Sequence, residues 1–181
     1  MYALVENNTI TKYFSYPKGF TLGDLQYPAD IFTKWSVAEK EAIGIYEIIF
    51  DDSNKKDEKY YINTNQSFVY DASTETATAS YGAATPKNTA ALKTEFVTEL
   101  KNQVAGELNK TDWYVIRNTE KSIAIPSNIS THRDAIRTKQ ASMETAIMSA
   151  ADPEALKTLY TYTTTDGVQS RPLGELPVLE S

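Results

Sequence analysis

The chain of 181 residues contains few side chains of the kinds that catalyse reactions or bind metals. Its only histidine, His132, is close to Asp134 in a segment with helical periodicity. A hydrolase needs a nucleophile and a base within hydrogen-bonding reach, and one histidine on a helix supplies no such spacing. The positions one helical turn away hold Asn128 and Ile136, so a second metal ligand is missing as well. We therefore expect no enzyme, no catalytic residue and no metal at His132.

The acidic segment 51–59 superficially resembles a calcium-binding loop, and seven of its nine residues are charged. However, Lys56 stands where such a loop needs an oxygen ligand, and no glycine supplies the sharp turn. We interpret the segment as a solvated loop. The sequence also lacks a Gly-rich phosphate-binding loop and a nucleophile elbow, and it contains no cysteine. No cofactor is therefore expected.

Three arginines form the most distinctive group of charged residues. Arg133 and Arg137 are four residues apart, so they share one face of a predicted helix, and Arg117 precedes them near the predicted turn. Such a cluster can pair with Glu120 and Asp134 across the turn, or it can bind an acidic partner. The sequence leaves both interpretations open.

The elements that carry these arginines are predicted from apolar periodicity in residues 85–148. Two apolar series lie on either side of Pro126, which interrupts helices. The first is Leu92, Phe96, Val97, Leu100, Val104, Leu108 and Val115, and the second is Ile129, Ile136, Met143 and Ile147. Two helices folded back on each other bury these stripes, against each other or against a second copy. Gly106 and Asn109 are expected to interrupt the first helix near residues 111–113.

Residues 1–85 have the alternation typical of a small antiparallel β-sheet domain. Residues 2–14 read as a hairpin with an Asn-rich turn, and the apolar run 45–50 predicts a central strand. Between them, Ser36 and Glu39 have the spacing of a capping box, which predicts one short helix. This part of the chain is therefore expected to provide the sheet of the protein.

The remaining strand signals lie late in the same domain. Residues 60–62 and 68–70 are expected to pair as a second hairpin, and residues 76–81 are expected to add an edge strand. Residues 15–35 contain several prolines and glycines, so we predict mostly loop there. Tyrosine is the commonest aromatic residue, with 12 copies, which suits either an interface or an ordinary sheet surface.

The whole chain is therefore expected to have an α+β fold. Residues 1–85 form the sheet domain, residues 86–160 form the helical hairpin plus a short helix, and residues 161–181 form an extended C-terminal tail. The short helix is predicted from Asp152, Pro153 and Glu154, which suit a cap and a first turn. The polar tail has too few apolar residues for a core of its own, so we expect it to lie against its own subunit or a neighbour.

The charge distribution excludes some classes of partner. The net charge is −6, and residues 1–85 contain 7 lysines against 12 acidic residues. An acidic chain without a basic stripe argues against nucleic acid as the main partner. No run approaches the roughly 18 apolar residues of a membrane span, and the N-terminus lacks the features of a secretion signal. We expect synthesis in a cytoplasm and no membrane partner.

Two segments in the helical region resemble a known group of proteins. Residues 108–117 contain a leucine, the triplet Thr-Asp-Trp and an arginine, and residues 131–137 contain an Arg-x-x-x-Arg pair. This pattern resembles the helical module of bacteriophage tail assembly chaperones and tail-fibre assembly proteins. Residues 1–7 and 44–46 are similar to a small N-terminal module of phage tail proteins, and residues 172–178 are similar to their tails.

The resemblance implies a non-enzymatic structural or adaptor protein of the virion tail, made in the host cytoplasm. Its implied partners are other phage tail proteins, in the tail fibre or baseplate, and further copies of itself in a homo-oligomer. Trp113, Arg117, Arg133 and Arg137 are the residues expected to form the docking surface. No catalytic role is assigned to them.

Two alternatives remain at this stage. The first is a transient chaperone of tail-fibre folding, which would be absent from the mature virion. The second is a carbohydrate-binding module that uses a Tyr-rich sheet around Tyr60, Tyr61 and Tyr70, because aromatic rings on a sheet can stack on sugars.

Overall fold

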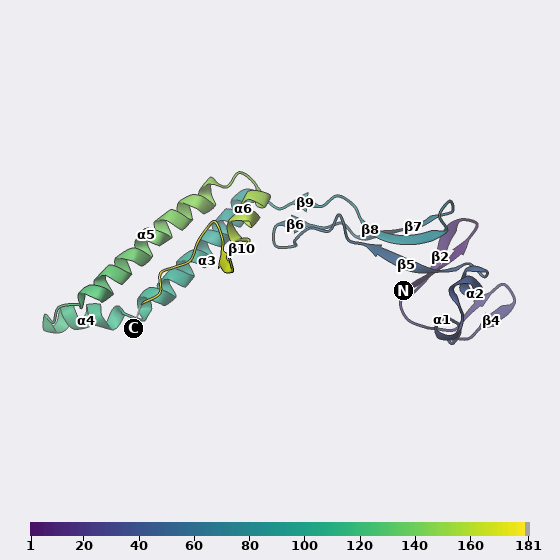
Figure 1. Ribbon diagram of the computed structural model, residues 1–181, viewed down its shortest axis with the longest axis horizontal. Coiled ribbons are helices and arrows are strands. Elements are labelled where there is room, and N and C mark those ends of the chain that lie inside the picture. The colour runs from purple at the N-terminus through teal and green to yellow at the C-terminus, as the bar shows by residue number, and fades with distance from the viewer. Residues whose placement is uncertain (180–181) are drawn as a thin grey trace. The chain divides into compact units, whose positions relative to one another are not determined.

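The computed structural model describes residues 1–179, and it has the α+β fold expected from the sequence (Figure 1). Its residues divide into a strand-rich unit and a helix-rich unit. The strand-rich unit contains residues 1–58 and 62–85, and the helix-rich unit contains residues 59–61 together with the chain from residue 86 onward. The division near residue 85 falls where the sequence places the domain boundary, but residues 59–61 belong to the helices.

The strand-rich unit is built on a five-stranded sheet in the order β2-β1-β5-β8-β7. Its strands are β1 (Tyr2–Glu6), β2 (Thr9–Phe14), β5 (Ile45–Asp51), β7 (Gln66–Asp71) and β8 (Thr76–Tyr81). Neighbouring strands are antiparallel except β5 and β8, which are parallel with Ile48 opposite Ala77. The sheet is therefore mainly antiparallel, with one parallel pair that the sequence did not predict.

Local sequence signals correctly located several elements of this unit. The hairpin of β1 and β2 turns at Asn7 and Asn8, whose φ angles of 51° and 59° lie in the left-handed region that asparagine tolerates. Ser36 and Glu39 form the predicted capping box at the start of helix α2 (Val37–Glu41). Strand β5 is central in its sheet, as its apolar sequence predicts.

The strand pairing predicted for residues 60–81 is wrong. Strand β7 pairs with β8, not with residues 60–62, and β8 lies inside the sheet and not at its edge. A tight turn joins β7 to β8, in which the Asp71 carboxylate accepts a hydrogen bond of 2.8 Å from the backbone of Ser73. Strand β6 (Tyr61–Ile62) pairs instead with β9 (Thr85–Pro86). The tight turn between β7 and β8 favours their pairing over a hairpin with a longer connection to residues 60–62.

Both faces of the five-stranded sheet bury apolar side chains. One face packs against α1 (Ile31–Lys34) and the hairpin of β3 (Phe20–Leu22) and β4 (Leu25–Tyr27), elements that the sequence interpreted mostly as loop. That cluster contains Leu4, Phe14, Phe20, Ile31, Phe32 and Ile45. On the other face, Tyr13 of β2 and Phe68 of β7 lie with ring centroids 4.7 Å apart. These are the two edge strands, so the sheet curls strongly.

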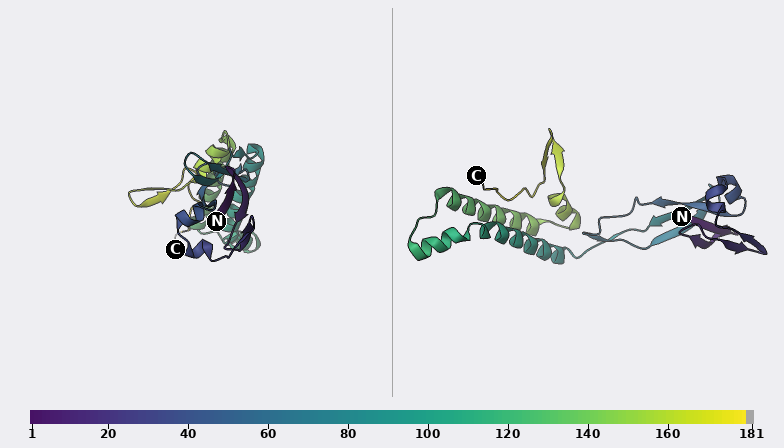
Figure 2. Two further views of the ribbon diagram at one scale, coloured as in Figure 1. Left: turned by 90° about the vertical axis from the view of Figure 1, so that its right-hand side faces the viewer. Right: turned by 90° about the horizontal axis from the view of Figure 1, so that it is seen from below.

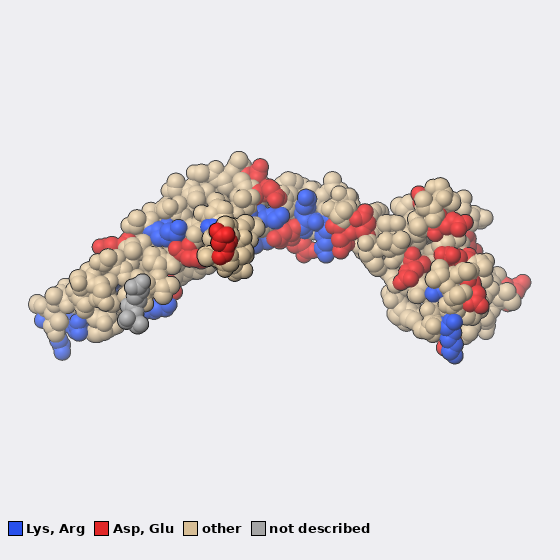
Figure 3. Space-filling model, in the orientation of Figure 1, with Lys and Arg blue, Asp and Glu red and all other residues tan. Residues whose placement is uncertain are grey.

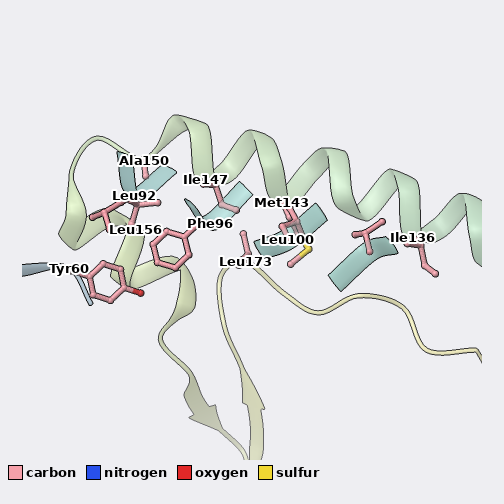
Figure 4. Packing of buried hydrophobic residues seen from close by; sticks show 11 residues of the cluster. Tyr60, Leu92, Phe96, Leu100, Ile136, Met143, Ile147, Ala150, Leu156 and Leu173 are labelled. Carbon is pink, nitrogen blue, oxygen red and sulfur yellow. The ribbon is translucent and has the colours of Figure 1, made fainter. Parts of the chain in front are cut away.

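The helix-rich unit contains the expected helical hairpin. Its helices are α3 (Thr89–Asn109), α4 (Asp112–Lys121), α5 (Ser127–Ser149) and α6 (Pro153–Tyr160). Helices α3 and α5 lie side by side and bury their apolar stripes against each other and α6 (Figures 1, 2 and 4). The core residues are Tyr60, Leu92, Phe96, Leu100, Val104, Ile136, Met143, Ile147, Ala150, Leu156 and Leu173. No helix within residues 1–179 is long and apolar enough to cross a membrane.

The predicted interruption of the first helix is present, and it separates α3 from α4. Leu92, Phe96, Leu100 and Val104 are buried in α3, whereas Val115 in α4 is exposed. The apolar stripe therefore ends with α3, and α4 does not continue the packed face.

The C-terminal tail is only partly the extended segment that we expected. It contains a hairpin of β10 (Thr163–Thr165) and β11 (Val168–Ser170), which turns at Asp166 and Gly167 with φ angles of 53° and 78° (Figure 2). An Asp-Gly pair is the favoured turn for a two-residue hairpin loop. After the hairpin, Leu173 is buried in the helical core, so the tail packs against its own chain. The last two residues of the predicted tail, 180–181, lie outside the described residues.

Candidate docking surface on helix α4

The residues considered for catalysis and metal binding, His132 and the loop after β5, belong to different units of the chain. His132 is half-buried on α5, where it borders a groove with Ser127 and Thr131, and its side chain makes no hydrogen bond within residues 1–179. The loop after β5 is exposed, and Asp51 accepts a hydrogen bond of 2.9 Å from the backbone of Ser53. The described part of the chain contains no group of three or more His, Asp or Glu side chains that could hold a metal ion.

Arg133 has an internal role and not the surface role predicted for it. Its side chain is only 9% exposed. One terminal nitrogen donates to the Leu108 carbonyl at 2.8 Å and to the Thr111 hydroxyl at 2.7 Å, and the other lies 2.8 Å from the Asp112 carboxylate. The last carbonyls of a helix lack the usual partner one turn further along the helix. The Leu108 carbonyl at the end of α3 accepts hydrogen bonds from the backbone and hydroxyl of Thr111, and Arg133 supplies a further donor. Arg133 therefore joins α5 to the junction of α3 and α4.

Arg137 lies on the surface of α5 and pairs within its own helix. Its guanidinium lies 3.0 Å from the Asp134 carboxylate, three residues earlier, and both side chains are about half exposed or more. An exposed pair of this kind contributes little to stability. The three arginines therefore have different environments. Arg133 pairs across the turn, but with Asp112 and not with Glu120, whereas Arg137 pairs with Asp134 of its own helix.

Arg117 and Trp113 form an aromatic and cationic cluster on α4. The guanidinium carbon of Arg117 lies 4.7 Å from the Trp113 ring centroid and 5.2 Å from that of Tyr114. The two rings are themselves 3.8 Å apart. A cation over an aromatic face is attracted by the electron density of the ring, which fixes the guanidinium over the indole. Trp113 is half exposed, whereas Tyr114 and Arg117 are half-buried and the Nε of Arg117 is buried without a hydrogen-bond partner in the described residues.

Helix α4 leaves its apolar residues uncovered. None of the described residues Asp112–Lys121 is buried, and Trp113 and Ile116 are 50% and 56% exposed. Together with Arg117 and Lys121, they recur at three- and four-residue steps and share one side of the helix. We call these four residues, Trp113, Ile116, Arg117 and Lys121, the α4 face. Exposed apolar residues gathered in this way are characteristic of an interaction surface.

The tyrosines proposed as a carbohydrate platform differ in environment and belong to two different units. Tyr60 is buried in the helical core, where its ring stacks on Phe96 at 5.8 Å. Tyr61 donates a hydrogen bond of 2.8 Å to Glu154 of α6, and this bond raises the pKa of the tyrosine. Tyr70 belongs to the sheet, and its ring lies 4.7 Å from Tyr46. Tyr60 is therefore not accessible to a sugar, whereas Tyr61 and Tyr70 are half-buried.

The sequence predicted the break that separates α4 from α3 and named Trp113 and Arg117 for a docking surface, but it did not single out Ile116 or Lys121. Trp113 and Ile116 fit the apolar series equally well as core residues, so only the packing distinguishes the two. Comparisons of the chain with protein-family models, with curated proteins and with solved structures find no match. The interpretation of the site therefore depends on its geometry and on the resemblance described above.

Proposed function

We propose that the protein is a non-enzymatic structural or adaptor component of a bacteriophage tail, in the baseplate or fibre-attachment region. It acts by docking the α4 face against another tail protein. The observation that carries this proposal is an ordered helix without a buried residue in the described range Asp112–Lys121, whose surface contains a half-exposed tryptophan and an exposed isoleucine beside a stacked arginine. Such a surface is far more typical of a docking site than of an active site.

The composition of the α4 face suits protein recognition. Tryptophan and arginine are enriched among the residues that dominate binding energy at protein interfaces. A short helix gains most of its stability from packing its apolar face, and within the described residues Trp113 and Ile116 of α4 are left about half exposed. Arg133 fixes the start of α4 through Asp112 and Thr111, so the face is preorganised before binding. Preorganisation reduces the entropy lost on docking.

The assignment to a phage tail rests on the resemblance in the same region. The triplet Thr111-Asp112-Trp113 and Arg117, which carry much of that resemblance, lie at the start and middle of α4. A segment that matches the pattern and is also exposed is consistent with a recognition role in such proteins. The transient chaperone remains a separate outcome, to be distinguished by experiment.

Quantitative mass spectrometry of purified phage particles beside the infected-cell lysate tests the proposal. We expect the chain in particles at a fixed stoichiometry relative to known tail proteins. Detection only in the lysate would identify an assembly chaperone and would contradict the structural role. Absence of the chain from both samples would contradict the assignment to a phage.

A variant of the α4 face tests which surface docks. Trp113→Ala removes a large exposed ring, and we expect it to lower incorporation into particles at least about tenfold, because a hot-spot residue contributes about 2 kcal/mol or more. Tyr16→Ala is the matched control, since Tyr16 is 63% exposed in the strand-rich unit. Equal incorporation of the two variants would exclude α4 as the docking surface.

A further inference from the structure

A second candidate binding surface lies in the strand-rich unit. It is a groove of about 400 Å³ formed by α2, β5 and the start of β8. Its lining includes Val37, Glu41, Tyr46, Glu47, Ile49 and Glu75. We call this set of residues the acidic groove. Its volume lies within the range of pockets that hold large side chains or ligands.

The acidic groove combines exposed aliphatic residues with carboxylates that lack cationic partners. Val37 and Ile49 are 60% and 55% exposed, although both are aliphatic. Glu41, Glu47 and Glu75 form no ion pair with any residue in the described range 1–179. The groove therefore offers apolar area beside negative charge, which suits an occupant that is both apolar and cationic.

Tyr46 lines the acidic groove together with its glutamates. A hydrogen bond with Tyr70 is the main cause that raises the pKa of Tyr46 to about 12, and burial adds to it. The charges of Glu75 and Glu41 act in the same direction, since a nearby anion disfavours a phenolate. Tyr46, Glu41 and Glu75 line the same groove, although they come from different elements of the unit.

The two units of the chain differ in net charge, and this difference indicates which surface could occupy the acidic groove. The strand-rich unit contains 6 lysines and 12 acidic residues, a net charge of −6, whereas the helix-rich unit contains 12 cationic and 12 acidic residues. On the side shown in Figure 3, the end of the helical hairpin at α4 displays Lys and Arg atoms without Asp or Glu atoms. The most complementary surface available to the acidic groove thus belongs to this same chain.

The charges of α4 itself favour this pairing. Asp112 is held by Arg133 inside the helix-rich unit, so its charge is already compensated. Of the remaining charged residues on α4, Arg117 and Lys121 form no ion pair within residues 1–179, and Glu120 is the only opposing charge. The α4 face is therefore apolar with a cationic margin, as the acidic groove requires.

We propose that the acidic groove binds the α4 face of a second copy of the chain. In this contact, Trp113 and Ile116 cover the exposed aliphatic side chains of the groove, and Arg117 and Lys121 approach its glutamates. Because the two surfaces are different, the contact is heterologous, and each copy can bind one neighbour through its groove and another through its helix. Repetition of the contact generates a ring or a filament.

This inference rests on the docking role proposed for α4 but not on the assignment to a phage tail. A chain that self-associates through these surfaces and is absent from particles would contradict the tail assignment alone. A chain that is present in particles but remains monomeric in solution under all conditions would contradict only the inference. The two failures are therefore distinguishable.

Sedimentation velocity of the full chain measures the association directly. We expect the weight-average mass to increase with concentration up to about 1 mM, the scale of a weak contact. Raising the salt from about 0.1 M to about 1 M shortens the Debye length from about 10 Å to about 3 Å, so we expect weaker association at high salt. A mass that stays monomeric over this concentration range at the lower salt overturns the proposal.

A charge-swap experiment tests the identity of both surfaces. One variant carries Glu41→Lys and Glu75→Lys, and the other carries Arg117→Glu and Lys121→Glu. Each variant alone places like charges in the contact, so we expect its dissociation constant to rise at least about tenfold. In an equimolar mixture, the groove of each variant faces the opposite charge on the other, and we expect association to return. Failure of the mixture to associate overturns the pairing.

The control must distinguish the effect of charges in the acidic groove from the effect of the net charge of the chain. Asp24→Lys with Asp52→Lys makes the same change in net charge at two exposed positions outside the acidic groove. We expect this variant to associate as the original chain does. Equal loss of association in this control would overturn the groove as the binding site, and unchanged circular dichroism of all variants establishes that they remain folded.

Discussion

The two units of the molecule bury their apolar residues in different ways. The helix-rich unit has one continuous cluster in which α3, α5, α6 and the tail share the same core. The strand-rich unit divides its buried residues between the two faces of one sheet, and its second cluster is made largely of alanines under partly buried aromatic rings. A helical hairpin can concentrate its apolar stripes in one interface, whereas a curled sheet must cover two faces.

The same two units also differ in what they leave exposed. The helix-rich unit has no net charge and exposes an apolar and cationic helix, whereas the strand-rich unit is strongly acidic and exposes an acidic groove. Core residues therefore stabilise each unit, while the exposed complementary surfaces are available for other copies or partners. The following variants test whether stability is confined to each unit in this way.

The largest effect is expected from Phe96 in the helical core. Its side chain is fully buried, and its ring lies between those of Tyr60 and Tyr160, at 5.8 Å and 4.6 Å. Truncation of a buried phenylalanine to alanine costs about 3–5 kcal/mol. We expect Phe96→Ala to lower the free energy of unfolding of the helices by this amount and to leave the strands unchanged, as measured by hydrogen exchange of backbone amides.

Phe32→Ala is the reciprocal experiment in the strand-rich unit. Phe32 is 5% exposed and contacts the rings of Tyr2 and Phe14, each at 5.0 Å. We expect a loss of similar size, about 3–5 kcal/mol, confined to the amides of the sheet. If either variant lowers the hydrogen-exchange protection of backbone amides equally in both units, the chain unfolds as one cooperative body. The two units would then not be stabilised separately.

A smaller effect is expected from Arg133, which connects the helices. Arg133→Ala removes two hydrogen bonds and an ion pair from a nearly buried site and leaves the Leu108 carbonyl without this donor. Because Asp112 is partly exposed, water compensates some of the loss, so we expect about 2–3 kcal/mol in urea unfolding. Arg137→Ala is the control, and its exposed pair should contribute no more than about 0.5 kcal/mol. If the two variants lose the same free energy of unfolding, the Arg133 contacts contribute no more to stability than an exposed ion pair.

Sequence reasoning was most successful where one local pattern determines the structure. The series Ile129, Ile136, Met143 and Ile147 is completely buried, because a helical stripe has only one way to face a neighbouring helix. The capping box at Ser36 and the Asn-Asn turn are likewise short-range features, complete within four residues. Such signals require no knowledge of the rest of the fold.

Features that depend on long-range contacts could not be predicted in the same way. Tyr60 has the sequence context of a strand, but it packs on Phe96 because α3 passes beside it. Arg133 resembles a surface arginine in the helical pattern, and only the break between α3 and α4 creates the buried partners that hold it. The acidic groove has no sequence signature, since its glutamates come from α2, β5 and the turn before β8. In contrast, the Asp166-Gly167 pair is a short-range turn signal from which the β10–β11 hairpin could have been predicted, but we expected an extended tail there.

A position specific to the strand-rich unit is Gly44, directly before β5. Its φ angle is +78°, and an added Cβ would lie 2.5 Å from the Val5 carbonyl oxygen. That carbon would strain the left-handed backbone and displace β1 from its place beside β5. We expect Gly44→Ala to cost about 2 kcal/mol in the thermal unfolding of the sheet. Gly23→Ala separates the strain of the left-handed backbone from the close contact of the added Cβ. Gly23 has a φ of +58°, but no neighbouring atom lies within 4 Å of an added Cβ. Its cost should be about 1 kcal/mol.

The smallest effect is a pH dependence that should distinguish the helix-rich unit. Burial raises the pKa of Tyr160 to about 12, from about 10 in an unfolded chain. The neutral phenol is therefore favoured by the fold, and its contribution to stability is complete below about pH 10 and is lost as the pH rises through about 12. Because the side chain is partly accessible to water, we expect a loss of about 1–2 kcal/mol over this range.

Tyr160→Phe keeps the ring that stacks on Phe96 but removes the titrating hydroxyl. We expect the urea midpoint of the helices to fall less steeply between about pH 10 and pH 12 in this variant than in the original chain. Tyr13→Phe is the control, since Tyr13 belongs to the strand-rich unit and its replacement should leave the pH dependence of the helices unchanged. If both variants flatten the curve equally, alkaline unfolding is shared by the two units and their independence is disproved, whereas a change confined to Tyr160→Phe assigns it to the helical core.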